Sequence, residues 1–146
     1  MKFSLLQENL NLALTNVSRF VSSKNQLPIL NNILLSTDQG RLKLSATNLE
    51  LSINYWIGAK IEKEGSITIP SKEITEFISY LSTGKLDLFL NQENNLLTIS
   101  SDKTESSFTT APSSDFPQFP QVDNNSLFEI DLNVFSQSIS QIAFSA

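Results

Sequence analysis

The fold is decided by residues 3–21, FSLLQENLNLALTNVSRFV, which combine a short apolar strand with an amphipathic helix. Phe3 and Leu5 mark the strand. After them, apolar side chains recur at three- and four-residue intervals, the spacing that gathers side chains on one face of a helix. The opposite face is mostly polar and uncharged, with one guanidinium from Arg19. The apolar face consists of Leu10, Ala13, Leu14, Val17 and Val21.

The apolar spacing of Leu10, Leu14 and Val17 occurs twice more, 64 and 125 residues further along the chain. Repeated strand-helix units commonly stack to form one continuous surface. We therefore expect each copy to place an equivalent helix on an equivalent wall. The matching residues are Ile74, Ile78 and Leu81 in the second copy, and Phe135, Ile139 and Ile142 in the third.

Composition excludes several classes of protein. The 146 residues are 40% hydrophobic, which fits one globular domain, or one domain and a fragment. The sequence contains no cysteine and no histidine, so disulfides, thiolate nucleophiles, the commonest general base and the commonest metal ligand are missing. We expect a noncatalytic protein without a metal or cofactor. No secretory signal or bilayer-spanning apolar run is present, so we expect a cytoplasmic protein that does not bind membranes.

The distribution of charge matters more than the net charge of −5. An acidic total argues against nucleic acid, because lysine and arginine drive binding to phosphates. Between Glu8 and Asp38, however, no carboxylate occurs, while Arg19 and Lys24 both lie in that interval. This asymmetry permits one face that tolerates a polyanion, although the same residues also fit an ordinary solvated helix and loop.

The rest of the chain predicts antiparallel strands around a second helix. We expect a hairpin of residues 29–36 and 41–45, and one long strand over residues 49–61, bent near Gly58, in which alternate residues are apolar. Trp56 lies on its polar side, where the indole either marks a contact or is covered by a loop. A strand at 66–69 enters a helix that Ser71 caps and that stops near Gly84, followed by strands at 86–90, 96–100 and 105–110.

This order predicts an α+β domain of two strand-helix-three-strand units with pseudo-twofold symmetry and with its helices on one face of antiparallel sheets. Pro112, Pro117 and Pro120 interrupt regular structure after it. We therefore expect one domain over residues 1–122, and a linker with the first strand (127–130) and helix of a second domain over residues 123–146. Nothing follows that helix to cover its apolar face, so we expect the chain to be cut near the start of the second domain.

Four local motifs occur in order along the chain: Met1-Lys2-Phe3; Leu27-Pro28-Ile29-Leu30 with Asn32-Ile33-Leu34-Leu35; Ala46-Thr47-Asn48-Leu49-Glu50; and Thr110-Ala111-Pro112-Ser113-Ser114-Asp115-Phe116-Pro117. Together they resemble the bacterial sliding clamp family, the beta subunit of the replicative DNA polymerase. The resemblance implies a DNA-clamp fold, and it makes the chain the first of three clamp domains with the start of the second. Two such subunits form a head-to-tail ring around duplex DNA and tether the polymerase. Polymerase and clamp-loader peptides bind between the later domains.

The resemblance also implies two sets of site residues. Lys24 matches the basic position that contacts the DNA backbone, with Gln26, Arg19 and Lys72 as weaker candidates; each alternatively reads as an ordinary surface residue. Glu73 departs from the family pattern, in which relatives often have a basic residue. The subunit interface is expected along the edge strand 105–110. Its candidates are Phe108, Ser106, Phe77 and Glu73, although Phe77 fits a core residue better.

Two other classes of protein are weighed against a clamp. An enzyme with paired carboxylates could use Asp87, Glu93 and Asp102, but these lie at strand ends and turns, where solvated acids are expected. A noncatalytic adhesion or partner-binding module would also fit the serine- and asparagine-rich surface. Neither alternative explains the order of the motifs.

Overall fold

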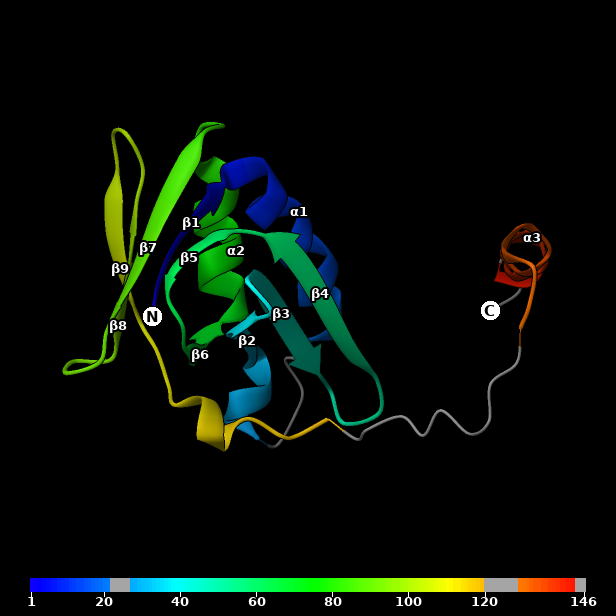
Figure 1. Cartoon of the computed structure of the whole chain (residues 1–146). Coiled ribbons are helices and arrows are strands. Elements are labelled where there is room, and N and C mark those ends of the chain that lie inside the picture. Colours follow the sequence, from blue (N-terminus) through cyan, green and yellow to red (C-terminus); the bar gives the residue numbers. More distant parts are fainter. Residues whose placement is uncertain (22–26, 120–128, 144–146) are drawn as a thin grey trace.

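A computed structural model describes residues 1–21, 27–119 and 129–143, and within them an α+β fold with two antiparallel sheets (Figure 1). The helices are α1 (Gln7–Val17) and α2 (Ser71–Tyr80), with α3 (Leu132–Ile142) apart from them, and the short 3-10 turns are η1 (Ser18–Phe20), η2 (Pro28–Asn31) and η3 (Ser113–Asp115). The strands are β1 (Lys2–Leu6), β2 (Asn32–Asp38), β3 (Arg41–Thr47), β4 (Ser52–Gly58), β5 (Lys60–Lys63), β6 (Ser66–Pro70), β7 (Lys85–Asn91), β8 (Leu96–Ser100) and β9 (Glu105–Thr109).

The first strand of each unit pairs in the sheet of the other unit, and this exchange of first strands holds the two units together. One sheet has the order β4-β3-β2-β6 and the other β5-β1-β7-β8-β9, so β1 pairs with the second unit and β6 with the first. The exchange keeps equivalent registers: Phe3 lies opposite Leu88, and Ile67 opposite Leu35. The predicted α+β class and pseudo-twofold arrangement are confirmed. Exchange of the first strands was not predicted.

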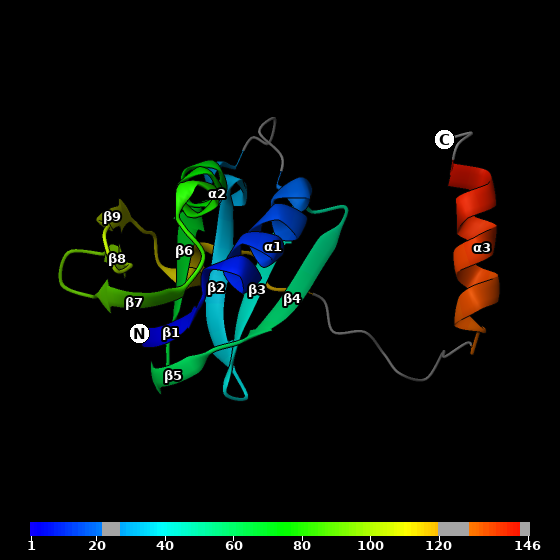
Figure 2. The ribbon, with the colours of Figure 1, turned by 90° about the horizontal axis from the view of Figure 1, so that it is seen from above.

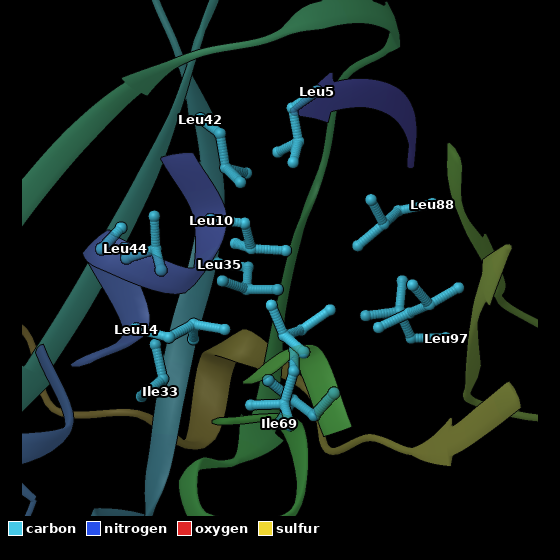
Figure 3. Close-up of a cluster of buried hydrophobic side chains, with 14 of the residues drawn as sticks. Leu5, Leu10, Leu14, Ile33, Leu35, Leu42, Leu44, Ile69, Leu88 and Leu97 are labelled. Carbon is cyan, nitrogen blue, oxygen red and sulfur yellow. The ribbon is translucent and has the colours of Figure 1, made fainter. Parts of the chain in front are cut away.

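The core lies between the two helices and the inner faces of both sheets (Figure 3). Leu10 and Leu14 of α1 and Ile74 and Ile78 of α2 are fully buried there, as their spacing predicts. The helices contact each other, and α1 also contacts β3 and β4 (Figure 2). Gln7 joins their ends, because its Nε2 donates a hydrogen bond of 2.7 Å to the carbonyl of Ile78. Both helices therefore turn their remaining faces outward from a shared core.

The predicted strand over residues 49–61 is wrong in two respects. Residues 48–51 form a turn, in which Asn48 Oδ1 accepts hydrogen bonds from the backbone N–H groups of Glu50 and Leu51, and Leu49 has φ +74°. The strand then breaks between Gly58 and Lys60, and its two parts pair in different sheets. The apolar side chains of Leu49 and Leu51 are consequently exposed rather than buried.

Several predicted boundaries are also wrong. Residues 29–31, the start of the strand expected at 29–36, instead belong to η2, which begins at Pro28. Pro70 occupies the N-cap position of α2, so Ser71 is its first residue and makes no capping hydrogen bond. The helix ends at Tyr80 and not near Gly84, whose carbonyl instead accepts a hydrogen bond from the Gln7 N–H. The strand expected at 127–130 lies partly outside the described residues, and residues 129–130 are not in a strand.

Met1 anchors the start of the chain in the core, where 1% of its surface is exposed. Its carbonyl accepts a hydrogen bond of 2.9 Å from the Leu90 N–H. Burial and the charge of Lys63 lower the pKa of its amino group. Gly65 lies against it, since a Cβ atom added to this glycine would stand 2.9 Å from the Met1 Cβ.

We predict that Gly65→Ala lowers the free energy of unfolding by about 1–3 kcal/mol, because the added methyl overpacks a site whose neighbour cannot move freely. Urea denaturation followed by circular dichroism measures the change. Gly58→Ala is the matched control, since a Cβ atom there meets nothing within 4 Å. Equal stability of the two variants would show that Met1 can shift away from the added methyl with little loss of stability.

Candidate nucleic-acid interface

The outward face of α1 is almost without charge. Its exposed residues are Glu8, Asn9, Leu12 and Thr15, of which only Glu8 is ionised. Thr15 Oγ1 donates to the carbonyl of Asn11 within the helix. Such a face offers hydrogen-bonding groups without a strong electrostatic field.

Arg19 and Lys72 supply the cations next to this face. Arg19 is exposed in η1, which contacts α2, and Lys72 is exposed in the first turn of α2. Two carboxylates, from Glu73 and Glu76, are exposed on the same helix as Lys72. The two predicted cations thus lie at one end of the helix pair, but α2 as a whole presents an acidic face.

A hollow of about 750 Å³ opens between the end of α1 and the start of α2. Lys72, Glu73 and Glu76 line it, together with Pro28, Pro70 and Val21. Lys24 and Gln26, the main predicted DNA contacts, lie outside the described residues.

Three of the four predicted interface residues, Phe77, Ser106 and Phe108, lie at the open edge of the five-stranded sheet. β9 is its last strand, and Phe108 pairs in register with the buried Leu97, so the Phe108 side chain points toward the helices. There its ring meets Phe77 of α2, with centroids 5.1 Å apart and planes at 64°. Ser106 lies on the same face of β9 and is half-buried, like both rings. Glu73 lies one turn before Phe77 and is exposed.

Two surface features were not predicted as sites. One is Tyr80, the last residue of α2, whose side chain is 88% exposed. On the other sheet, the indole of Trp56 donates a hydrogen bond of 2.7 Å to Asp38, with Lys43 Nζ 5.3 Å and Arg41 Cζ 5.9 Å from its ring centroid. Side chains of neighbouring strands, and not a loop, therefore hold the indole.

Metal and membrane chemistry have no visible basis in the residues that the structure describes. Over residues 1–21, 27–119 and 129–143, no group of three or more acidic side chains could hold a metal ion. Within the same ranges, no helix has the length and apolar character needed to cross a membrane.

Residues 1–120 match the family model of the DNA polymerase III beta subunit, N-terminal domain. The chain belongs to this family. The Beta sliding clamp of Synechococcus elongatus is 30% identical over 146 residues, which cover 99% of this chain and 39% of that protein. This chain thus spans about two fifths of the length of that curated relative. The residues that match the family model include both candidate sites.

Solved structures of beta subunits share the fold. The Caulobacter crescentus pol III beta structure has a TM-score of 0.82 and 30% identity, covering 96% of this chain and 38% of that one. The Bacillus subtilis sliding clamp has a TM-score of 0.90 over 99% of this chain and 40% of that one, and at 22% identity it supports the fold alone. The predicted family and clamp fold are confirmed.

Proposed function

We propose that this chain is the first domain of a sliding clamp, a noncatalytic processivity factor of the bacterial replicative polymerase. Two complete subunits would form a head-to-tail ring that encircles duplex DNA without sequence preference and acts in the cytoplasm. The observation that carries the proposal is the family match over residues 1–120, and the described residues in that range include two helices that contact each other and have exposed outer faces. Polymerase and clamp-loader subunits would bind through other domains.

The weak charge of the helical face supports this function. A protein that holds DNA by affinity needs many lysine and arginine contacts, and those contacts slow its movement. A closed ring holds DNA by topology, so loose and water-mediated phosphate contacts suffice. The nearly uncharged outer face of α1 and the few nearby cations fit a surface along which DNA slides.

The division into domains is part of the proposal. Residues 1–122 would form the first clamp domain, and residues 123–146 the linker and the start of the second, with α3 as its first helix. In α3, Phe135 and Ile139 are 49% and 45% exposed, although they repeat the spacing of the buried Leu10 and Leu14. An amphipathic helix buries its apolar face against a core, so other residues of the second domain would cover this face in the complete subunit.

Retention on DNA tests the proposed function. The complete subunit, loaded by a clamp loader onto circular duplex DNA, should co-elute with it through gel filtration at high salt. Cutting the circle with a restriction enzyme should release the protein, because a ring slides off a free end. Retention that is equal on circular and linear DNA would instead support ordinary binding, and no retention on either would support a partner-binding module.

We predict that Lys24→Glu weakens equilibrium binding of the complete subunit to duplex DNA and lowers the slope of log affinity against log salt by about one. Fluorescence anisotropy with a labelled duplex across several salt concentrations measures both quantities. Lys63→Glu, an exposed lysine of β5, makes the same change in net charge and is the control. If Lys24→Glu changed neither affinity nor slope, Lys24 would not contact the DNA backbone.

A further inference from the structure

A second, smaller hollow of about 340 Å³ lies at the end of the domain where α2 leads into β7. Its walls are the connection after α2 and the turn between β8 and β9, which stand at the same end of the domain in Figure 1. Tyr80, Lys85, Asp102 and Lys103 line it, with hydroxyls of Ser82 and Thr83. We refer to this site as the Tyr80 hollow. Its volume is at the lower end of the range of about 300–1,000 Å³ that is typical of ligand sites.

The charge of the Tyr80 hollow differs in sign from that of the whole chain. Its lining carries two lysines and one aspartate, whereas the chain has a net charge of −5. Lys103 forms no ion pair with any residue that the structure describes. Lys85 pairs with Asp87 at 2.7 Å, but both side chains are more than half exposed, so the pair contributes little and a phosphate can compete for the lysine.

Tyr80 provides a second kind of contact. The ring is 88% exposed at the last residue of α2, so its surface is open to a ligand. Aromatic rings beside basic side chains are the usual platform for unpaired bases, which stack on the ring while lysines contact the phosphates. In an intact duplex the faces of the bases are covered by their neighbours, so the same ring could contact only the backbone.

We propose that the Tyr80 hollow binds single-stranded DNA, with one base stacked on Tyr80 and the adjacent phosphates near Lys103 and Lys85. Within a clamp, the proposed function on which this rests, the strand would be the unpaired template next to a primer end. Glu76 lies one helical turn before Tyr80 and repels phosphates, and Asp102 does so within the hollow. The strand would therefore leave past Lys103 rather than along α2.

The test compares single-stranded and duplex DNA on the 146-residue chain. Fluorescence anisotropy with a labelled oligothymidylate should show that Tyr80→Ala weakens binding by about tenfold, the loss typical of one stacked base. Tyr80→Phe keeps the ring, so its affinity for the oligothymidylate should stay within about twofold of that of the parent. Lys103→Glu should lower this affinity and reduce its dependence on salt concentration. Affinity for a labelled duplex should be unchanged by Tyr80→Ala. Lys63→Glu controls for net charge, and thermal unfolding confirms that each variant is folded.

Two results would overturn the proposal. In one, Tyr80→Ala leaves the affinity for the oligothymidylate unchanged. In the other, it weakens single-strand and duplex binding equally, which would make Tyr80 a backbone contact. Retention of the complete subunit on circular duplex DNA does not depend on this stacking. A failed retention test would therefore reject the clamp, whereas these two results would reject only the Tyr80 hollow.

Discussion

Leu14→Ala is expected to lower the free energy of unfolding by about 3 kcal/mol, the largest effect on stability that we predict for one substitution in this domain. Leu14 is fully buried and belongs to the cluster that joins α1 to the sheets (Figure 3). Removing its side-chain methyls loses their transfer free energy and leaves a cavity among strands that cannot close around it. Urea denaturation, fitted to a two-state transition, measures the loss.

Leu12→Ala is the matched control for this prediction. Leu12 lies on the same helix, two residues earlier, but it is 57% exposed on the outward face. Its truncation removes the same atoms from water-exposed surface, so the change in stability should stay within about 0.5 kcal/mol. Similar losses for the two variants would mean that the outer face of α1 is covered in solution, and that the core assigned to Leu14 is wrong.

The helical spacing made the core predictable. Leu10, Leu14 and Val17 are all buried, and so are Ile74 and Ile78 at the equivalent positions. The third equivalent residue, Leu81, follows the end of α2 and is only half-buried. Spacing predicts which side chains share a face, but it does not predict where the helix ends. Helix α2 ends before the connection to β7. In that connection, the Gly84 carbonyl accepts a hydrogen bond from the Gln7 N–H of the first unit.

Strand pairing was less predictable, because alternation is a property of one strand and pairing depends on the whole fold. Residues 52–62 alternate without a break in the sequence, yet β4 and β5 belong to different sheets. The change of sheet follows from the exchange of β1 and β6, since β5 must reach β1. Leu49 and Leu51 fit the alternating pattern equally well, but the Asn48 turn removes them from it.

The candidate sites show the same limit. Phe77 and Phe108 are 31 residues apart in sequence, and the resemblance to a clamp was what linked them before their rings were found in contact. Tyr80 and Lys103 had no such motif, because their hollow is formed only when the connection after α2 meets the β8–β9 turn. Sites made by one segment can be recognised from sequence, whereas sites made between segments need the fold or a relative.

Phe108→Asp in the complete subunit is expected to convert the proposed ring dimer into monomers at micromolar concentration. The Phe77–Phe108 pair lies half-buried at the open edge of the sheet, the position from which an aromatic anchor fills a partner's surface. A carboxylate there would be buried without a partner, which costs about 2–4 kcal/mol at each interface. Sedimentation velocity over a range of protein concentrations measures the change in assembly.

Phe108 also packs against the core of its own domain, so its replacement could act through folding rather than through the interface. Ser106→Asp separates the two effects, because Ser106 shares the inner face of β9 and lies away from the Phe77 ring contact. It should weaken the dimer, while the loss of thermal stability of the domain should be smaller than that of Phe108→Asp, because the ring contact with Phe77 is kept. Thr109→Asp places the same charge on the exposed outer face of β9 and should leave the dimer intact. An intact dimer for both Phe108→Asp and Ser106→Asp would remove the β9 edge from the subunit interface, since two buried carboxylates at that edge are incompatible with tight packing against a second chain.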